Sequence, residues 1–321
     1  MQTRLWQQEE HQVCLCSLRS TGQILGLVFR FLLLAFILIL IGRAMKDPVI
    51  SSVGTIDKRV HNGTVRDTNS TQNTIYDVIN NGLTSPVLLV CANDGFLDFL
   101  TNLMLSISRL NLSPNILIIC EDVLIYHKLS QHRECSVVHY RLALTHLEKS
   151  LSEASAWKSD GYIHLVRKRP RYVGILLSHG IDVLYVDTDI VWLGDPFPFF
   201  TGVSDIYIQQ ELEESILYCA GFFYMRSNIR TITFVDTWAK THFKGRRGIQ
   251  RAFNDLLAIY NNISVAPLPT SQFCSGHTFF SSKTPWAERE PPVIEVHANF
   301  IAGFQNKKES LMNAGLWFLK D

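Results

Sequence analysis

Residues 183–200 read VLYVDTDIVWLGDPFPFF, in which a short apolar run ends at two aspartates one residue apart. The run 181–186 has the length and β-branched content of an interior strand, so Asp187 and Asp189 are predicted to emerge where that strand leaves its sheet. Side chains at i and i+2 point to the same side of a strand, and Gly194-Asp195-Pro196 supplies a turn beyond them. Both carboxylates can then converge on one hard divalent cation, at the edge where open α/β sheets bind ligands.

The rest of the chain alternates strand-like and helix-like segments around that stretch. Short apolar runs predict strands, and longer segments with apolar residues at helical spacing predict helices. This alternation implies an α/β fold with a Rossmann-like, mostly parallel central sheet, helices on both faces and added antiparallel strands. The other predicted strands are 87–92, 115–120, 136–140, 205–209 and 220–225, and the predicted helices are 97–110, 171–179, 232–243 and 249–260.

The composition is that of a folded protein with little net charge. The 321 residues are 47% hydrophobic and 18% charged, and the formal net charge is +1. A disordered chain would be poorer in apolar residues, and a nucleic-acid-binding surface needs an excess of Lys and Arg. We therefore expect a globular domain and no nucleic-acid partner.

Residues 24–41 are apolar apart from Gly26, Arg30 and Ala35, and are long enough to cross a bilayer. An arginine at mid-helix costs about 3 kcal/mol, but the fifteen large apolar residues, at roughly 0.3–0.6 kcal/mol each, outweigh it. We therefore predict a cytoplasmic tail at 1–23 and a transmembrane signal anchor at 24–42. The alternative is a cleaved signal peptide whose apolar core is 31–41.

Residues 43–85 are rich in Thr, Ser and Asn and lack apolar periodicity, which predicts a lumenal stalk ahead of a catalytic domain at 86–321. Sequons for N-glycosylation lie on the C-terminal side of the predicted span, at Asn62, Asn69, Asn111 and Asn262. They favour exposure to the lumen, so we expect a single-pass type II protein of the Golgi or endoplasmic reticulum membrane. The sequence indicates no oligomeric state.

Five cysteines follow the predicted span, so at least one of them is unpaired. Cys91 lies in a strand-like run and is predicted to be a buried thiol. Cys120 with Cys135 and Cys219 with Cys274 are the candidate disulfides, and the sequence alone does not establish either pair.

Five segments carry a family resemblance through their order along the chain. Together they resemble the nucleotide-diphospho-sugar transferase family that includes the plant rhamnogalacturonan xylosyltransferases, over about residues 86–317. The resemblance implies the A-type glycosyltransferase fold, a nucleotide-sugar donor used with Mn²⁺ or Mg²⁺, UDP as the nucleotide, and retention of configuration. The segments are KRPRY at 168–172, the aspartate block at 183–200, AGFFYMRSN at 220–228, QRAFN at 250–254, and HANF at 297–300 followed by Gly303 and Lys307.

The resemblance also implies roles for individual residues. Asp187 and Asp189 would hold the cation that bridges the two phosphates, with His297, which follows a strand-like segment, as the third ligand. Lys307 would meet the diphosphate as a point charge, although a Lys307-Lys308 pair also fits a solvated surface. Without the resemblance, the two aspartates also fit a solvated loop and His297 a structural histidine.

Residues at other strand ends are expected near the nucleotide. Ala92, Asn93 and Asp94 end the first strand and Asp122 follows the second, which is where such folds hold the base and ribose. Loop capping is the alternative role for these side chains. Gly221 fits a place where the backbone must approach the donor sugar closely.

The remaining assignments follow the family blocks. Arg169 and Tyr172 match a basic-proline-tyrosine block and are assigned to donor binding, with packing as the alternative, and Gly303 is assigned to the same donor site. Gln250, with Asn254, matches an amide pair near the acceptor and joins the two aspartates as a catalytic candidate. Ordinary polarity of an exposed helix is the alternative for this pair.

Two departures from the family put the sugar contacts in doubt. Many relatives carry an aspartate where this chain has Ile249, and some carry an asparagine where it has Cys219. Retention by double displacement would need a carboxylate nucleophile, and three of the four candidates form a charged cluster that we interpret as a solvated face. We therefore favour a same-face mechanism in which the departing phosphate activates the acceptor hydroxyl. The candidates are Glu211, Glu213, Glu214 and Asp255.

The sequence thus predicts a metal-dependent retaining glycosyltransferase that moves a sugar from a nucleotide-diphospho-sugar, with UDP favoured, to a hydroxyl of a glycan or glycoprotein. A catalytically silent lumenal binding protein on the same fold is one alternative. A phosphohydrolase with Asp187 as its nucleophile is another, but that class expects the motif near the start of its domain, and about 100 domain residues precede it here.

Overall fold

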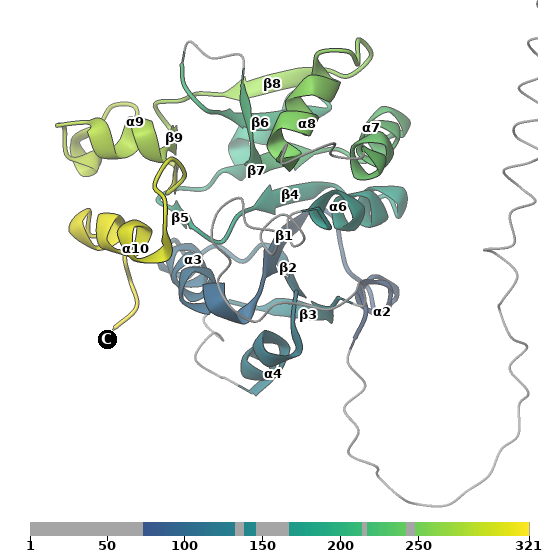
Figure 1. Cartoon of the computed structure of the whole chain (residues 1–321), viewed down its shortest axis with the longest axis horizontal. Coiled ribbons are helices and arrows are strands. Elements are labelled where there is room, and N and C mark those ends of the chain that lie inside the picture. The colour runs from purple at the N-terminus through teal and green to yellow at the C-terminus, as the bar shows by residue number, and fades with distance from the viewer. Residues whose placement is uncertain (1–72, 132–137, 146–166, 214–216, 242–247, 321) are drawn as a thin grey trace, which may run out of the picture. The chain divides into compact units, whose positions relative to one another are not determined.

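The computed structural model describes residues 73–131, 138–145, 167–213, 217–241 and 248–320, all of which belong to one compact unit, Asn69–Asp321. Their centre is a seven-stranded sheet in the order β3-β2-β1-β4-β7-β6-β8 (Figure 1). The strands are β1 Val87–Ala92, β2 Asn115–Cys120, β3 Tyr140–Leu144, β4 Val183–Val186, β6 Ile206–Gln210, β7 Tyr218–Met225 and β8 Val265–Leu268.

The sheet confirms the predicted mostly parallel architecture. Strands β3, β2, β1 and β4 are parallel neighbours, and β6 pairs in parallel with β8. Strand β7 is antiparallel to both β4 and β6, so it alone among these seven runs against the others. The ends of β4, β6 and β8 and the start of β7 therefore lie along one edge, which we call the carboxyl edge.

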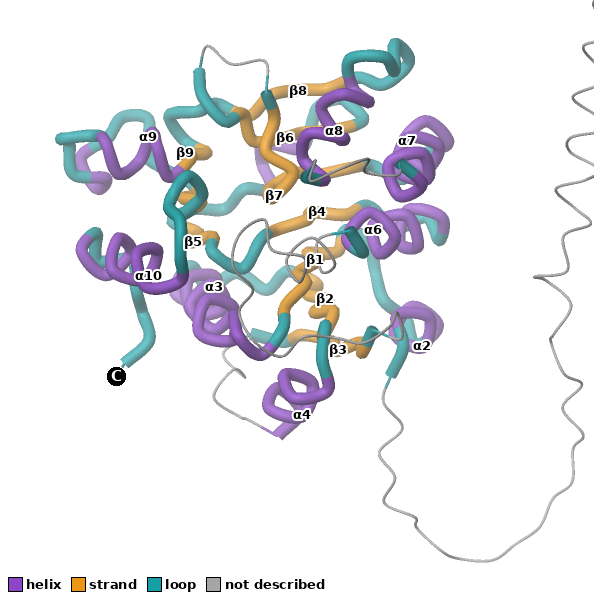
Figure 2. The backbone as a smooth tube through the Cα atoms, viewed as in Figure 1, coloured by secondary structure: helices purple, strands orange, loops and turns teal. Residues whose placement is uncertain are grey.

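Helices cover both faces of this sheet, as Figure 2 shows. Alternate residues of β1 face the two sides, with Val87 and Leu89 in one buried cluster and Leu88 and Val90 in the other, as the period of two in a strand requires. The first cluster is covered by α2 Ile75–Asn80, α6 Arg169–Ser178, α7 Ile229–Lys240 and α8 Ile249–Leu257, and the second by α3 Leu97–Arg109 and α4 Val123–Gln131.

A second, three-stranded sheet stands beside the carboxyl edge and consists of β5 Ile190–Trp192, β10 Glu295–His297 and β9 Phe273–Ser275. It packs with α9 Gly276–Ser281 and α10 Phe304–Asn313 around a third apolar cluster. Phe99 of α3 joins the two parts, because its ring lies 4.8 Å from Phe304 and 5.2 Å from Trp317. The C-terminal part of the chain thereby packs against α3.

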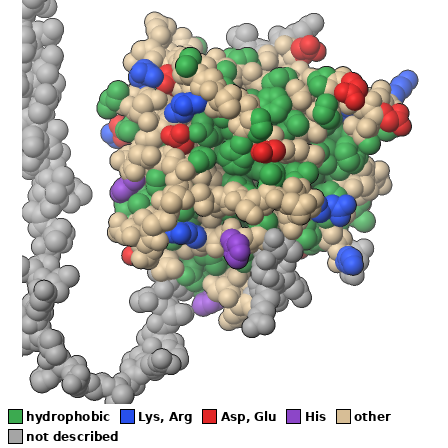
Figure 3. All heavy atoms as spheres, turned by 180° about the vertical axis from the view of Figure 1, so that it is seen from behind, with side chains coloured by type: hydrophobic (Ala, Val, Ile, Leu, Met, Phe, Trp, Pro, Cys, Tyr) green, Lys and Arg blue, Asp and Glu red, His purple; other side chains and the backbone are tan. Residues whose placement is uncertain are grey.

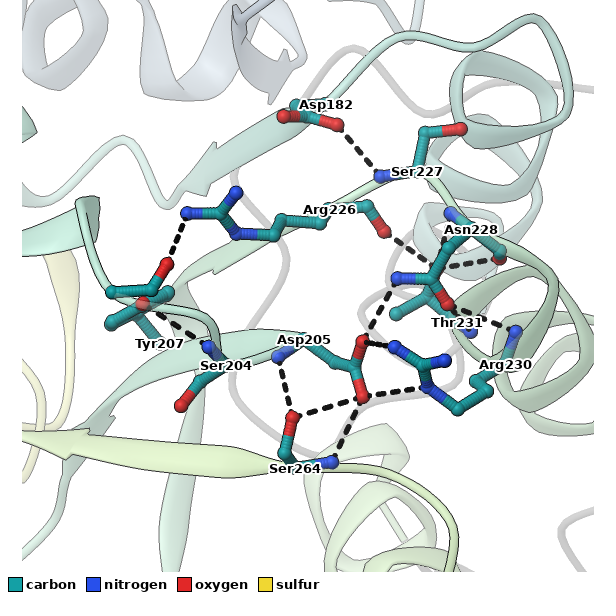
Figure 4. A network of polar contacts seen from close by, with 11 residues as sticks. Asp182, Ser204, Asp205, Tyr207, Arg226, Ser227, Asn228, Arg230, Thr231 and Ser264 are labelled. Atoms are coloured by element: carbon teal, nitrogen blue, oxygen red, sulfur yellow. Dashed lines mark hydrogen bonds and ion pairs between the residues drawn. The ribbon is translucent and has the colours of Figure 1, made fainter.

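A dense polar network closes the opposite edge of the main sheet (Figure 4). Asp205, just before β6, accepts hydrogen bonds from Asn228 and Arg230 and from both the backbone N–H and the hydroxyl of Ser264. Asn228 also caps α7 through a capping box, which satisfies N–H groups that the first turn leaves free. The network therefore ties β6, β7, α7 and the residue before β8 together.

The folded unit begins ahead of residue 86. Ile75 and Val78 of α2 are buried in the core, and Thr74 caps this helix through a capping box with Asp77. Among the described residues no helix combines the length and apolarity that a bilayer crossing requires. The predicted anchor, 24–42, lies outside the described residues, as does most of the predicted stalk.

The structure contradicts one of the two predicted disulfides. Cys219 on β7 of the main sheet and Cys274 on β9 of the small one are both buried, free thiols. That disulfide prediction is therefore wrong. Cys120 is also a free, buried thiol, while Cys135 lies outside the described residues. Cys91 is a free thiol, as predicted, and is half-buried.

The surface agrees with the small net charge. On the face shown in Figure 3, charged side chains of both signs are scattered among polar and hydrophobic ones, and no basic stripe is visible on the described residues of that face.

Candidate metal centre at the carboxyl edge

Three ligand-type side chains converge beside the end of β4. One carboxylate oxygen of Asp187, one of Asp189 and one ring nitrogen of His297 all lie within 4.8 Å of one another. His297 Nε2 is 3.3 Å from Asp189 Oδ1 and 3.9 Å from Asp187 Oδ2. The structure therefore brings together the three residues that the sequence predicts as metal ligands.

The local backbone explains this convergence. Strand β4 ends at Val186 and β5 starts at Ile190, so both aspartates lie in the short link where the chain passes from one sheet to the other. His297 is the last residue of β10 and pairs with Ile190. The N–H of Asp187 donates to the carbonyl of Gly221 at 2.8 Å, which fixes the start of the link.

Gly221 makes room for the cluster. A Cβ atom at this position would lie 2.5 Å from Asp187 Oδ2 and 2.6 Å from His297 Cε1, closer than non-bonded atoms approach. The sequence predicts that Gly221 allows close approach of the donor sugar. In the structure it allows close approach of the ligand side chains themselves.

A buried relay orients the imidazole of His297. Gln209 Nε2 donates to Glu295 Oε2 at 3.0 Å, so the amide oxygen of Gln209 faces His297 Nδ1, 3.1 Å away. Nδ1 must then carry a hydrogen, and Nε2 is the nitrogen directed at the aspartates. Gln209 and Glu295 are fully buried, and burial raises the pKa of Glu295 to about 8. Sequence reasoning missed both residues, which lie 86 positions apart.

Cations from two other elements pair with the aspartates. Lys307 of α10 forms an ion pair with Asp189 Oδ2, and Arg169 Nη1 lies 2.8 Å from Asp187 Oδ1. Burial would raise the pKa of Asp189, but Lys307 and His297 outweigh it and hold the pKa well below its usual range. Tyr185 donates to the same oxygen of Asp187 as Arg169 does, at 3.0 Å. The second oxygen of Asp187 is thereby directed toward His297.

The atoms that face one another suit a divalent cation. Burial would lower the pKa of His297, but Cys219 and Asp189 raise it well above its usual range. The nitrogen Nε2 faces Asp189 Oδ1, and carboxylate and imidazole groups arranged in this way can serve as ligands of one metal ion. The three residues fit a metal ion because one ligand atom of each converges with the others, while the remaining polar atoms of these side chains contact Arg169, Gln209 and Lys307.

Comparison with known proteins identifies the family. Residues 111–311, more than half of the chain, match the family model described as nucleotide-diphospho-sugar transferase. The chain belongs to this family. The resemblance found in the sequence is therefore confirmed, and so is the prediction of a glycosyltransferase with an A-type-like fold.

The individual proteins that the chain resembles share 28% or fewer of the aligned residues with it. The transferase is 28% identical over 262 residues to UDP-D-xylose:L-fucose alpha-1,3-D-xylosyltransferase 3 of Arabidopsis thaliana, covering 73% of this chain and 67% of that one. It is 28% identical over 284 residues to UDP-galactose:fucoside alpha-3-galactosyltransferase of Dictyostelium discoideum, spanning 73% of this chain but only 43% of that protein. The solved structure of the glycosyltransferase GlyE of Streptococcus pneumoniae aligns with a TM-score of 0.49 at 14% identity, over 74% of this chain and 61% of that one.

In the transferase, the predicted nucleotide residues form a capped loop beside β1 and β2. Asp122 Oδ2 accepts from the N–H of Asp94 and its Oδ1 from the N–H of Ile125, both at 2.8 Å. Asn93 is buried, and the carbonyl of Ala92 accepts from the backbone after β2 at 2.8 Å. Asp122 thus caps α4 and holds the loop at 93–94, which brings the four predicted positions together at one strand edge.

Arg169 and Tyr172 of the basic block lie in different environments. Arg169 reaches the metal cluster, whereas Tyr172 is buried and its hydroxyl shares a hydrogen bond with Thr145 at 2.7 Å. Behind them lies a buried pair that sequence reasoning missed, Lys168 and Glu121, with 3.4 Å between Nζ and Oε2. Burial raises the pKa of Glu121 to about 7. Tyr172 therefore packs beneath the site.

The amide pair lies on α8 and is engaged with β7 and the end of β6. Gln250 donates to Glu211 Oε1 at 2.6 Å and accepts from the N–H of Ala220 at 3.3 Å. Asn254 accepts from the N–H of Tyr218 and donates to its carbonyl, at 2.8 and 2.9 Å. Glu211 is partly buried, so interpreting it as part of a solvated face is wrong, because Gln250 holds it against the sheet.

Gly303 lies directly before α10. Gly303 has φ +90, which favours glycine, and its carbonyl accepts from the N–H of Lys307 at 3.2 Å. It therefore sets the turn that begins α10 and so directs Lys307 toward Asp189. Glu213 and Asp255 are exposed, and Glu214 lies outside the described residues.

Proposed function

We propose that this glycosyltransferase is metal-dependent and retaining, and that it moves a pentose or hexose from a UDP-sugar to a hydroxyl of an L-fucosyl residue. The convergence of Asp187, Asp189 and His297 supports metal dependence. The donor and acceptor are carried over from the relatives, whose names give UDP-D-xylose or UDP-galactose as donor and fucose or a fucoside as acceptor. Two donors and one acceptor class recur among them, so the donor sugar stays open between pentose and hexose.

The three ligands would hold Mn²⁺ or Mg²⁺, with the imidazole nitrogen favouring Mn²⁺. The bound cation would neutralise the negative charge that develops on the diphosphate as the bond to the sugar breaks. Arg169 and Tyr185 would keep Asp187 in its binding rotamer. Lys307, already paired with Asp189, lies close enough to the cluster to meet an oxygen of the leaving diphosphate as a point charge.

Transfer would follow the same-face route. The acceptor hydroxyl attacks the anomeric carbon from the side that the diphosphate leaves, and the departing phosphate oxygen takes the hydroxyl proton. The products are UDP, which has taken up the proton of the hydroxyl, and the new glycoside, in which the acceptor oxygen is bonded to the anomeric carbon. Gln250 would contact the transferring sugar, in an orientation set by Glu211 and the N–H of Ala220. NMR of the product should show the donor's anomeric configuration, and an inverted product would overturn this mechanism.

The proposal places the domain in the secretory lumen on a type II anchor at 24–42, in the Golgi or endoplasmic reticulum. The apolar run at 24–41 and the sequons C-terminal to it support this arrangement. Glycosylation of Asn111 or Asn262 in cells, detected as a mobility shift on deglycosylation, would test it. An unglycosylated chain accessible to cytosolic protease would overturn it.

The first test of the function is ligand-dependent stabilisation of the purified full chain in detergent. UDP-, GDP- and CMP-sugars would be screened by thermal melting, with Mn²⁺ or with chelator. We expect a shift with UDP-sugars that requires Mn²⁺, because a ligand that binds only the folded state at 100 times its Kd adds about 2.7 kcal/mol. A well-folded sample that responds to no donor would overturn the proposed function.

A further inference from the structure

A hollow of about 420 Å³ lies at the carboxyl edge, away from the metal ligands. Its walls come from the end of β6, the end of β8 and the residues that follow, and α9 (Figure 1). It falls within the roughly 300–1,000 Å³ range of small-molecule sites. The lining residues are Gln210, Glu213, Pro267, Leu268, Pro269, Thr270, Ser271 and Thr278.

The sheet topology fixes where this hollow lies relative to the metal centre. Strands β4, β6 and β8 run in the same direction, so their carboxyl ends share one edge, in the order β4-β7-β6-β8. Neighbouring strands are about 4.8 Å apart, which puts the end of β6 roughly 10 Å and the end of β8 roughly 14 Å from the aspartates. A diphosphate on the metal, the transferred sugar and then the acceptor would span a length of this order.

The hollow is also joined to the metal centre through its own walls. Gln210 follows Gln209, the residue that orients His297, and the Gln210 amide donates to the carbonyl of Glu213 at 3.2 Å. Thr278 shares a hydrogen bond of 3.1 Å with Ser275, which pairs with His297 across β9 and β10. The two sites are therefore built on the same strands.

The lining chemistry suits one class of ligand. Two prolines and Leu268 form an apolar wall, and the other lining residues offer a carboxylate, an amide and three hydroxyl groups. A pyranose presents an apolar C–H face and a rim of hydroxyl groups, which such a lining can bind. A 6-deoxy sugar carries a methyl group in place of the hydroxymethyl group, and burial of that methyl group against the apolar wall is favourable.

We propose that this hollow is the acceptor subsite, and that it holds the L-fucosyl residue with its methyl group toward Pro267 and Pro269 and its hydroxyl rim toward Glu213, Thr270 and Ser271. The inference rests on the proposed function, since it names where that function's acceptor binds. It adds residues that neither the family blocks nor the metal centre contain.

The test separates acceptor binding from donor chemistry. In the full chain, E213Q and the double change T270V with S271A would be compared with T233V, a matched change on α7. For each protein we would measure the KM for p-nitrophenyl α-L-fucoside, the hydrolysis of the UDP-sugar by water, and the Kd of UDP with Mn²⁺.

We expect each subsite variant to raise the acceptor KM about tenfold, the loss expected for one or two hydrogen bonds. Donor hydrolysis and UDP affinity should stay within twofold of the unmodified chain, as should all values for T233V. An unchanged acceptor KM in both subsite variants, with normal donor hydrolysis, would overturn the location of the subsite.

The acceptor class has its own control. The corresponding L-galactoside differs from the L-fucoside only by a hydroxyl on carbon 6, which the apolar wall should disfavour, so we expect a higher KM for it. Donor hydrolysis without transfer to the fucoside would overturn the acceptor class. Failure of the proposed function is distinct from both, because the unmodified chain would then bind no UDP with Mn²⁺.

Discussion

Two carboxylate clusters sit at opposite edges of the same sheet and differ in how their oxygen atoms are used. At the amino edge, both oxygens of Asp205 accept hydrogen bonds from neutral and cationic donors, and its side chain is only 3% exposed. At the carboxyl edge, oxygens of Asp187 and Asp189 face each other and an imidazole nitrogen. Asp205 thus uses both of its oxygens to hold the fold together, whereas the convergence of Asp187, Asp189 and His297 can accept a cation, as the proposed function requires.

The largest expected effect comes from removing a ligand at the carboxyl edge. Asp189→Asn should reduce transfer about 1,000-fold or more, because the charge on the leaving diphosphate is no longer offset. Manganese binding, followed by electron paramagnetic resonance of free Mn²⁺, should fall in parallel while the unfolding midpoint stays within a few degrees. Normal manganese binding in this variant would remove the aspartate from the metal site.

The relay behind His297 gives the next effect. Gln209→Leu should lower manganese affinity roughly 10–100-fold, the range seen when partners of metal ligands are changed, because Nδ1 loses the acceptor that fixes the ring. Its neighbour provides the matched control, since Gln210→Leu should keep manganese affinity and raise the acceptor KM instead. Equal manganese affinity in the two variants would contradict this division of roles.

The amino edge should respond in stability alone. Asp205→Asn should lower the free energy of unfolding by about 2 kcal/mol in urea titrations, because buried donors lose a charged partner, with manganese affinity unchanged. Hydrogen bonds from Arg230 and Ser264 outweigh the effect of burial and lower the pKa of Asp205. The contribution of Asp205 to the free energy of unfolding is therefore present above its unfolded-state pKa, near 4, and is lost as the pH falls below that value. The variant's stability should depend less on pH in that window, and a parallel pH dependence would contradict this.

The smallest effect tests the space between the ligands. Gly221→Ala should weaken manganese binding about tenfold, since its methyl group would displace Asp187 or His297, and a shift of this size leaves other ligands in place. Gly248→Ala is the matched control, because a Cβ there meets nothing within 4 Å. If both variants bind manganese like the unmodified chain, the ligand side chains can shift without loss of manganese affinity, which would contradict this prediction.

Which parts of the fold could be predicted follows from the burial of each segment. Strands β1, β2, β4 and β7 are continuous apolar runs buried on both faces, so periodicity and flanking turns found them. Helix α10 buries only Leu311, and α2 is six residues long within a polar stretch, so neither shows an apolar stripe. Their positions depend on tertiary contacts that a local pattern does not contain.

The candidate site divides in the same way. The two aspartates follow a recognisable strand, and His297 was found only through its family block. Gln209, Glu295 and Glu211 acquire their roles through contacts between strands and helices far apart in the chain. Their sequence context shows ordinary polar residues, and only the three-dimensional pairing reveals which of them is buried against a ligand.

The pairing of Lys307 with Asp189 joins residues 118 positions apart, and this spacing has a consequence for biosynthesis. A ribosome adding roughly 5–20 residues per second needs about 6–24 s to travel from the aspartates to that lysine. Once residue 268 has been added, the nascent chain contains every strand of the main sheet, yet its two acidic side chains still lack His297 and Lys307. A polypeptide interrupted between residues 268 and 297 would therefore contain the whole main sheet but neither His297 nor Lys307, and we expect it to be inactive.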